Sequence, residues 1–327
     1  MTPKERHVLV TGGAGFIGSH LVDQLLERPD TRVTVLDKLS YAGSLDNLSA
    51  HEDDDRLAFV RGDVAEPSDV LPLVGGVDHV VHAAAESHVD RSIADGGVFV
   101  RTNVLGTQVV LEACRETGTP LLFVDTDEVY GAGDSGDSLF DEEAPLRPRN
   151  PYSASKAAAD LLCQSYRATY DLPVTIVRGT NAFGPRQHPE KAIPTYSLAA
   201  LDGRTIPVYG EGAQRREWLF VSDWAAACLT VLDAGEPGGV YNIGGGHELA
   251  NLDLARTVCR LAGADPALIG FVPDRPGHDF RYGLAWDRLG VLGWRPATAF
   301  EHGIEATIAW FRDHREWADA MRAGASA

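Results

Sequence analysis

A glycine-rich turn between an apolar run and a periodic segment constrains the fold of this chain most strongly. Val8-Leu-Val10 precedes glycines at positions 12, 13, 15 and 18, and residues 16–26 have helical periodicity. Glycines placed in this way permit a tight turn and a close approach of the backbone, and the helix N-terminus carries a partial positive charge. The pattern therefore predicts a strand–turn–helix unit that binds a pyrophosphate.

The first half of the chain continues to alternate strand-like and helix-like segments. Further apolar runs lie at residues 32–36, 57–61, 79–82 and 120–125, and residues 103–117 have helical spacing. Such alternation is typical of a doubly wound parallel sheet with helices on both faces. We therefore predict an α/β protein with a Rossmann-type sheet.

Glycine and proline become more frequent from Gly179 onward, and the strand-like runs become shorter. This change predicts a smaller, mixed α/β domain that binds the substrate. We expect a dinucleotide-binding domain over residues 1–178 and the smaller domain over 179–327. The two should interleave, with residues 218–248 returning to the first domain.

Composition excludes several classes of partner. The formal net charge of −18 disfavours nucleic acid and anionic membranes, so an anionic ligand must meet a local cluster of cations. No apolar stretch approaches the roughly 20 residues of a membrane span. The first residues lead directly into a strand without a signal peptide, so we expect a cytoplasmic protein. Scattered histidines and four distant cysteines predict no metal site and reduced, mostly buried thiols.

An acidic residue indicates which dinucleotide the turn binds. Asp37 ends the second strand, 19 residues after Gly18. A carboxylate there accepts hydrogen bonds from ribose hydroxyls and repels a 2′-phosphate, which favours NAD over NADP. Lys38 beside it could tolerate that phosphate. Asp63 follows the third strand and could bind the adenine amino group or act as a helix N-cap.

Two further motifs carry groups suited to proton transfer. Tyr152 and Lys156 are four residues apart, which places them on one face of a helix, and a neighbouring ammonium favours the phenolate. Thr126, Asp127 and Glu128 follow a buried strand at the edge where α/β sheets bind ligands. Neighbouring carboxylates repel, so one of the two acids should hold its proton more strongly.

These motifs together resemble the extended short-chain dehydrogenase/reductase superfamily, and they are most similar to dTDP-glucose 4,6-dehydratases. The resemblance extends from about residue 7 to residue 313. Its most specific element is Thr126-Asp127-Glu128. Related 4-epimerases lack the acid pair, and related UDP-glucuronate decarboxylases typically carry Thr-Ser-Glu.

The resemblance implies a role for each catalytic residue. Tyr152 removes the C4 hydroxyl proton of a nucleotide hexose, while Lys156 lowers its pKa and binds the nicotinamide ribose. Glu128 removes the C5 proton, Asp127 protonates the departing C6 hydroxyl, and Thr126 binds the reacting oxygen. NAD takes the C4 hydride and returns it at C6, so the hydro-lyase reaction is redox-neutral and the cofactor stays bound.

The resemblance also implies binding residues and a homodimer, with the helices from Asn103 and Tyr152 at its interface. Cofactor contacts are implied for Gly12, Gly15, Phe16, Ile17, Gly18, Asp37, Lys38, Asp63, Val64, Ala83, Ala85, Tyr152 and Lys156. Contacts with a nucleotide-diphosphate sugar are implied for Ser87, His88, Asn181, Lys191, Arg216, Asn251 and Arg281.

The sequence departs from the family pattern at four positions. Asp125 replaces the usual serine, and its side chain should point to the opposite face of the strand from Thr126. Ala182 and Phe183 replace an asparagine and a tyrosine, and Ala285 replaces an aspartate. The catalytic set is intact while the specificity residues are altered.

Other functions remain open at this point. A UDP- or GDP-sugar 4,6-dehydratase or a sugar-nucleotide 4-epimerase would share the fold and most of the motifs. A non-catalytic dinucleotide-sensing regulator would share the fold alone. Retention of Tyr152, Lys156, Asp127 and Glu128 argues against a regulator, since a sensor has no use for them.

Overall fold

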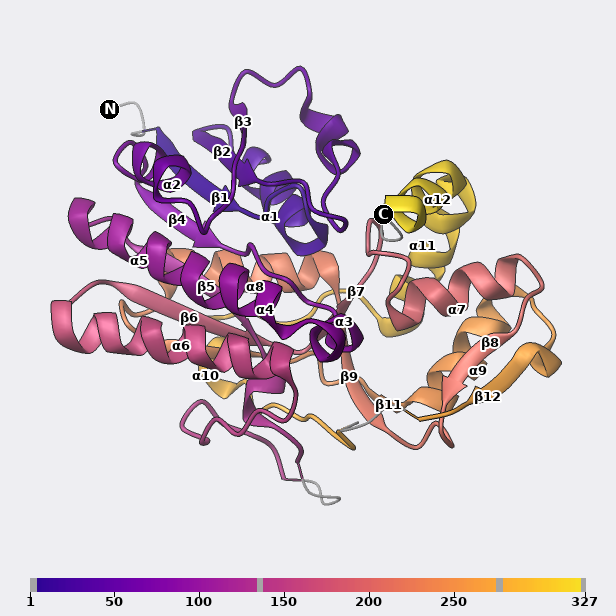
Figure 1. The fold of residues 1–327 in the computed structure, drawn as a ribbon. Helices are drawn as coiled ribbons and strands as arrows, with labels where there is room; N and C mark the ends of the chain where they lie inside the picture. Colours follow the sequence, from indigo (N-terminus) through magenta and orange to yellow (C-terminus); the bar gives the residue numbers. More distant parts are fainter. Residues whose placement is uncertain (1–4, 134–137, 275–278, 325–327) are drawn as a thin grey trace.

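A seven-stranded parallel sheet organises the computed structural model, which describes residues 5–133, 138–274 and 279–324 (Figure 1). The strand order β3-β2-β1-β4-β5-β6-β10 reverses between β1 and β4, which is the topology of a Rossmann-type sheet. The strands are β1 (Arg6–Thr11), β2 (Thr31–Asp37), β3 (Leu57–Arg61), β4 (His79–His82), β5 (Leu121–Thr126), β6 (Val174–Gly179) and β10 (Val240–Ile243).

Helices cover both faces of this sheet, as the alternating sequence predicts. One face packs on α1 (Phe16–Leu26), α8 (Val221–Ala234) and α10 (Asp287–Val291). The other packs on α2 (Pro67–Val74), α5 (Gly106–Thr117) and α6 (Pro151–Tyr170). Because both faces are covered, consecutive residues of β1 such as Val8, Leu9 and Val10 are all buried, which explains their uninterrupted apolar run.

The helix expected over residues 103–117 is shorter in the structure. Its regular part, α5, begins at Gly106, and a π-helical turn, Val100–Leu105, precedes it. The amide of Asn103 in that turn is occupied by the backbone of Glu86, to which it both donates (3.0 Å) and accepts (2.8 Å) hydrogen bonds. Short helices α3 (Val89–Ala94) and α4 (Gly96–Phe99) connect this turn to β4.

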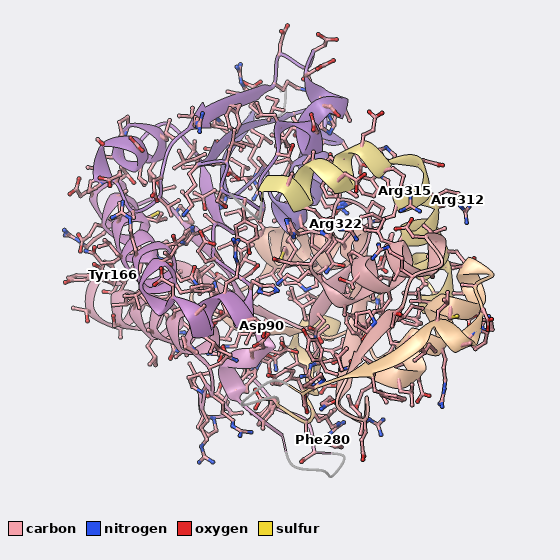
Figure 2. The ribbon with its side chains drawn as sticks, turned by 45° about the vertical axis from the view of Figure 1, so that its right-hand side comes forward. Asp90, Tyr166, Phe280, Arg312, Arg315 and Arg322 are labelled. Atoms are coloured by element: carbon pink, nitrogen blue, oxygen red, sulfur yellow. The ribbon has the colours of Figure 1, made fainter. Side chains whose placement is uncertain are left out.

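A second part of the molecule is built from two small sheets and the remaining helices (Figure 1). The sheets are β11-β9-β7 and β12-β8, with strands β7 (Asn181–Phe183), β8 (Ile206–Tyr209), β9 (Arg215–Phe220), β11 (Glu248–Ala250) and β12 (Ile269–Val272). The helices are α7 (Ala192–Leu201), α9 (Asn251–Ala262), α11 (Phe300–Asp313) and α12 (Arg315–Gly324). Arg315 ties α12 to the end of α7 through Asp202 (2.8 Å), and Figure 2 shows it beside Arg312 and Arg322.

The chain passes between the two parts several times. Within the predicted return over residues 218–248, α8 and β10 do rejoin the large sheet. Trp218 does not, because β9 pairs with β7 and β11 in the three-stranded sheet. Asp90 of α3 lies between the two parts in Figure 2.

Two further findings concern the composition. All four cysteines are buried, and none of them forms a disulfide. Within the described ranges, no helix combines the length and apolar character needed to cross a membrane. The expectation of a cytoplasmic location rested on the first residues, of which 1–4 lie outside the described part.

The close packing at the end of β6 leads to a stability prediction. A Cβ on Gly179 would overlap the ring of Trp224, which is fully buried. We expect Gly179→Ala to lower the free energy of unfolding by about 2 kcal/mol, because overpacking a rigid core displaces its neighbours. Urea unfolding measures this loss. The control is Gly76→Ala, whose added Cβ would meet nothing within 4 Å, and equal stability losses in both variants would contradict the packing account.

Candidate active site

A cavity of about 570 Å³ opens at the carboxyl ends of the parallel strands, near the reversal of strand order between β1 and β4. Ligands bind at such reversals in open α/β sheets. Both parts of the molecule line it. The sequence-predicted residues in its wall are Gly12, Gly15, Phe16, Ile17, Gly18, Asp37, Lys38, Val64, Ala83, Ala85, Ser87, His88, Thr126, Glu128, Tyr152, Lys156, Asn181, Lys191, Arg216 and Asn251.

The glycine-rich turn has room for a pyrophosphate because it lacks side chains. Gly12 has φ of +72°, and a Cβ there would lie 2.7 Å from the backbone of Ala84. A Cβ on Gly18 would collide with the carbonyl oxygen of Gly12. Gly15 is the N-cap of α1, so the free N–H groups of the first helical turn face the cavity.

Asp37 and Lys38 favour a ribose without a 2′-phosphate. The Asp37 carboxylate is fixed by the N–H groups of Ala14 (3.0 Å) and Leu39 (2.8 Å), and burial raises its pKa. Its remaining lone pairs can accept from ribose hydroxyls. Lys38 lies 3.0 Å from the buried carboxylate of Glu86, so its charge is already compensated. These residues fit NAD.

Asp63 forms a local turn in the structure. Its Oδ1 accepts a hydrogen bond from the N–H of Ala65 (2.9 Å), and its Oδ2 lies 3.6 Å from Arg101. The neighbouring Val64 lines the cavity, whereas Asp63 does not. The helix N-cap role is not borne out, because α2 begins at Pro67 and its N-cap residue is Glu66.

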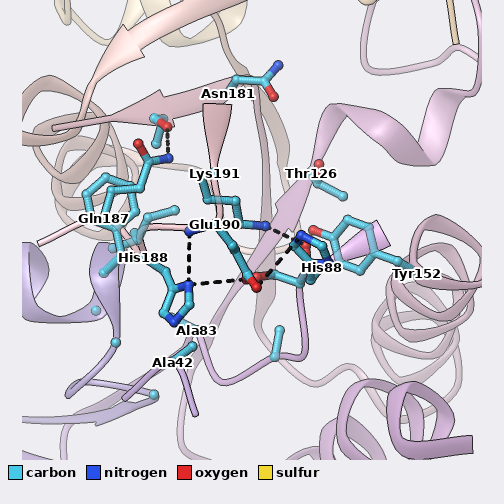
Figure 3. Close-up of a pocket in the computed structure, with 18 of the residues that line it drawn as sticks. Ala42, Ala83, His88, Thr126, Tyr152, Asn181, Gln187, His188, Glu190 and Lys191 are labelled. Atoms are coloured by element: carbon cyan, nitrogen blue, oxygen red, sulfur yellow. Dashed lines mark hydrogen bonds and ion pairs between the residues drawn. The ribbon is translucent and has the colours of Figure 1, made fainter. Parts of the chain in front are cut away.

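Tyr152 lies on the first turn of α6, beside Thr126 (Figure 3). Asn150 begins this helix with a capping box, in which its side chain accepts from the N–H of Ser153 (2.9 Å). Burial raises the pKa of Tyr152, and Glu128 raises it further, whereas a hydrogen bond with Thr126 lowers it. The sequence predicts that Lys156 lowers the pKa of Tyr152. In the protein without a bound cofactor, burial and the nearby acids instead raise this pKa.

Asp127 is a carboxyl group that keeps its proton. Only 2% of it is exposed, and burial followed by repulsion from Glu128 raises its pKa to about 8. Its Oδ2 has no hydrogen-bond partner among the described residues. Glu128 lines the cavity and accepts from the amide of Asn150 (3.3 Å). The two neighbouring acids therefore lie in different environments, because Asp127 is buried and Glu128 stands in the cavity wall.

The far end of the cavity carries polar groups from the second part of the molecule. The buried Nδ2 of Asn181 has no acceptor in the described structure. The guanidinium of Arg216 is held by the carbonyl oxygens of Arg215 (2.7 Å) and Asp279 (2.9 Å) and lies over the ring of Tyr282. Asn251 begins α9 at the same end.

A polar cluster bridges the two parts in the middle of the cavity. Figure 3 shows Glu190 between His188 (3.5 Å) and His88 (3.7 Å). The Nζ of Lys191 donates to the backbone carbonyl of Ser87 (2.9 Å). Lys191 and His88 thus reach the same region from opposite parts of the chain.

Comparisons with known proteins identify the family of this chain. A model described as the NAD dependent epimerase/dehydratase family matches residues 8–244. The chain belongs to this family. It is 47% identical to a dTDP-glucose 4,6-dehydratase from Streptomyces niveus over 96% of this chain and 95% of the relative. It is 50% identical to the low-salt glycan biosynthesis protein Agl12 from Haloferax volcanii, covering 93% and 98%.

A solved structure from the same family has the same fold. DesIV, a dTDP-glucose 4,6-dehydratase from Streptomyces venezuelae with NAD and TYD bound, superposes with a TM-score of 0.93 at 46% identity. The match covers 96% of this chain and 99% of that one.

Besides Asp63, two predicted residues lie outside the cavity wall. Asp127 lies behind it, in electrostatic contact with Glu128 and Arg216, which line it. Arg281 forms a bidentate ion pair with Glu248, with both contacts at 2.9 Å. The structure therefore does not bring the guanidinium of Arg281 among the cavity residues.

The departures from the family pattern lie in different environments. Ala182 lines the cavity, so the missing amide changes the substrate region. Phe183 is 1% exposed and packs edge-on against Trp218 and Phe220 in the core of the second part, so the missing hydroxyl faces apolar side chains. Ala285 lies outside the cavity wall, where its carbonyl accepts from Asn242 (2.9 Å).

Sequence reasoning missed several residues of the cavity wall. Glu190 adjoins the predicted Lys191, and that adjacency is a signal that could have identified it. Thr180, which directly precedes the predicted Asn181, also lines the cavity. Pro207 and Tyr209 of β8 line the far end, and no motif marks them.

Because the pKa of Asp127 is raised in the folded protein, we expect the free energy of unfolding to depend on pH. An unfolded chain loses this proton near pH 4, whereas the folded chain keeps it to about pH 8, so the wild-type protein loses stability as pH rises through this window. Asp127→Asn removes that slope of up to about 1.4 kcal/mol per pH unit. Urea unfolding of both proteins at pH 5 and pH 7 measures the difference. An identical stability change in the two proteins would contradict a buried, protonated Asp127.

Proposed function

We propose that the protein is an NAD-dependent hydro-lyase that converts dTDP-glucose into dTDP-4-keto-6-deoxyglucose. The observation that carries this proposal is the unlike pair formed by Asp127 and Glu128 beside Tyr152. Asp127 is buried with a pKa of about 8, and Glu128 lines the cavity. Elimination of water needs an acid and a base beyond the group that deprotonates the alcohol.

Tyr152 is the base for the first step. It takes the proton of the C4 hydroxyl while Thr126 holds the same oxygen, as their mutual hydrogen bond suggests. NAD, when bound, supplies the chemistry of a hydride acceptor at C4 and a hydride donor at C6. The phenol of Tyr152 would ionise more readily beside a positively charged nicotinamide, against the effect of the nearby acids.

Elimination then uses the two carboxyl groups. A ketone at C4 makes the C5 proton acidic, and Glu128 removes it from within the cavity. Asp127 gives its proton to the C6 hydroxyl, which leaves as water. A raised pKa suits this donor, because the group is still protonated near neutral pH.

Local cations support the binding of a diphosphate in an otherwise acidic protein. Lys191 and Arg216 line the cavity, and Asn251 lies at the same end as Arg216. The formal net charge of −18 gives no general attraction for a nucleotide, so these few groups must hold it. Tyr209 and Pro207 provide an apolar surface at this end for a base.

The rival functions differ in what they require. A 4-epimerase needs Tyr152 and NAD but has no use for a protonated Asp127. A UDP- or GDP-sugar dehydratase would use the same catalytic groups and differ only in the nucleotide. A dinucleotide-sensing regulator would need neither acid.

Cellular setting and assembly are also proposals. Four buried, unpaired thiols are compatible with a reducing, cytoplasmic compartment. The product class suits deoxysugar biosynthesis, including that of antibiotics and other natural products.

We propose a homodimer through α5, α6 and the turn before α5. Helices α5 and α6 lie side by side (Figure 1), and Val100, Leu105 and Leu161 expose apolar side chains there. We expect the wild-type protein to sediment as a dimer and a Val100→Glu, Leu161→Glu double variant as a monomer. A monomeric wild-type protein would contradict this interface.

The catalytic proposal is tested with a panel of nucleotide hexoses. We expect wild-type protein with NAD to convert dTDP-glucose to a 4-keto-6-deoxy product without added reductant. Tyr152→Phe should abolish this turnover, because the C4 proton then has no acceptor. Asp127→Asn should oxidise C4 but stall before water leaves, so absorbance of reduced nicotinamide should accumulate.

Each alternative has its own outcome in the same assay. Faster turnover of UDP- or GDP-glucose would reassign the nucleotide, and a galactose product would indicate an epimerase. Full turnover by Asp127→Asn would contradict the acid role. No turnover with any sugar would leave the regulator.

A further inference from the structure

Asp125 is a buried carboxyl group that the proposed mechanism does not use. It immediately precedes Thr126 at the end of β5, and its side chain is 0% exposed. Neither of its oxygens accepts a hydrogen bond from the described residues. Such a group is costly unless a cation compensates it. The family pattern that the chain resembles carries serine at this position, so the acid is a departure from it.

The compensating cation is Lys156. Side chains alternate along β5, so Asp125 faces the same way as Phe123, toward α6. The Nζ of Lys156 lies 3.6 Å from Asp125 Oδ1, donates to the carbonyl of Val124 (2.8 Å) and sits 4.1 Å from the centre of the Phe123 ring. Asp125 does lie on the face opposite Thr126, and the catalytic ammonium reaches it there.

The other charged groups near Asp125 are already matched. Arg178 of β6 forms two contacts with Asp160 of α6, at 2.8 and 3.1 Å. Cys163 of α6 is a buried thiol whose pKa is raised by burial, and His82 of β4 is kept neutral because burial lowers its pKa to about 3. Burial raises the pKa of Asp125 well above its usual value and Asp160 adds to this rise, whereas the Lys156 ammonium opposes it. The charge on Asp125 therefore depends on its contact with Lys156.

Tyr152 lies on the same helix as Lys156, about one turn before it. Three acids act on its phenol, namely Glu128, Asp125 and Asp127. An isolated ammonium beside the phenol would favour the phenolate, whereas an ammonium paired with a carboxylate acts as a dipole with a weaker field. The extent to which Lys156 lowers the pKa of Tyr152 thus depends on whether residue 125 is charged.

We propose that Asp125 is a positioning residue that acts as the counter-ion of Lys156 and makes Tyr152 ionise at a higher pH than a neutral residue at this place would. The inference rests on the proposed function only in taking Tyr152 as the catalytic base. One unit charge about 12 Å away, at an effective dielectric constant of about 20, moves a pKa by about one unit. Asp125 therefore sets the pH range in which C4 oxidation proceeds.

Titration of Tyr152 in the NAD-bound protein tests this directly. The phenolate absorbance of each protein is measured against pH, and the same protein with Tyr152→Phe is subtracted so that the other tyrosines cancel. We expect Asp125→Asn and Asp125→Ser to lower the midpoint by about one pH unit. Asp125→Glu keeps the charge and should restore the wild-type midpoint.

Glu142→Gln is the matched control. Glu142 is also a buried acid, but its Oε1 accepts from the N–H of Asn242 (3.0 Å), and the glutamine oxygen can keep that bond. The backbone carbonyl of Glu142 accepts a hydrogen bond from Arg178. Among the described residues, Glu142 forms no ion pair or hydrogen bond with Lys156. We expect Glu142→Gln to leave the midpoint of Tyr152 within a few tenths of a pH unit of wild type.

The rate of C4 oxidation gives a second measure. At a pH below both midpoints, Asp125→Asn should oxidise the sugar about tenfold faster than wild type, and the advantage should vanish at high pH. A residue needed only for folding would instead slow the reaction at every pH. A Tyr152 midpoint that stays in place or rises in both neutral variants overturns the inference. A lowered midpoint without turnover of any sugar would refute the proposed function and leave this inference standing.

Discussion

Burial of acidic side chains at the carboxyl end of β5 is the constraint on which the rest of the site depends. Asp125 and Asp127 are almost completely enclosed, and Glu128 stands in the cavity wall beside Tyr152. In water an aspartic acid side chain loses its proton near pH 4, so at neutral pH it would have no proton to give. Burial holds the proton on Asp127 and raises the pKa of Tyr152, so low polarity and mutual repulsion together create an acid, a base and a phenol with different tasks.

The large sheet makes this arrangement possible. Parallel strands end at the same edge, so the turn after β1, Asp37 of β2 and Thr126 of β5 all face one cavity. Helix α6 packs against β5 and carries Tyr152 and Lys156 to the same point. The second part of the molecule closes the other side with Lys191 and Arg216, so a long ligand can contact both parts at once.

Sequence patterns predict the scaffold well because they reflect local physics. The first helix begins at Phe16, directly after the glycine turn, since that turn and the apolar period are both encoded within a few residues. Long-range pairing is less visible, and Trp218 shows why. Residues 218–220 at the end of its strand are apolar like the strands of the large sheet, yet the strand pairs with β7 and β11.

The candidate site shows the same limit. Motifs identify Tyr152 and Asp127, but they do not reveal that Glu248 holds Arg281 or that Asp125 lies beside Lys156. Those contacts join residues that the fold alone brings together. The alternation of side chains along β5 correctly predicts that Asp125 faces away from Thr126. The contact that Asp125 makes there is with Lys156, which extends from α6.

The fate of the hydrogen on C4 tests the central claim most directly, because only an eliminating enzyme moves it along the hexose. Wild-type protein with NAD is incubated with dTDP-glucose that carries deuterium at C4, and the product is analysed by NMR. The account predicts deuterium at C6 of a 4-keto-6-deoxy sugar. Deuterium found at C4 of a hexose whose C4 still carries a hydroxyl group would contradict it.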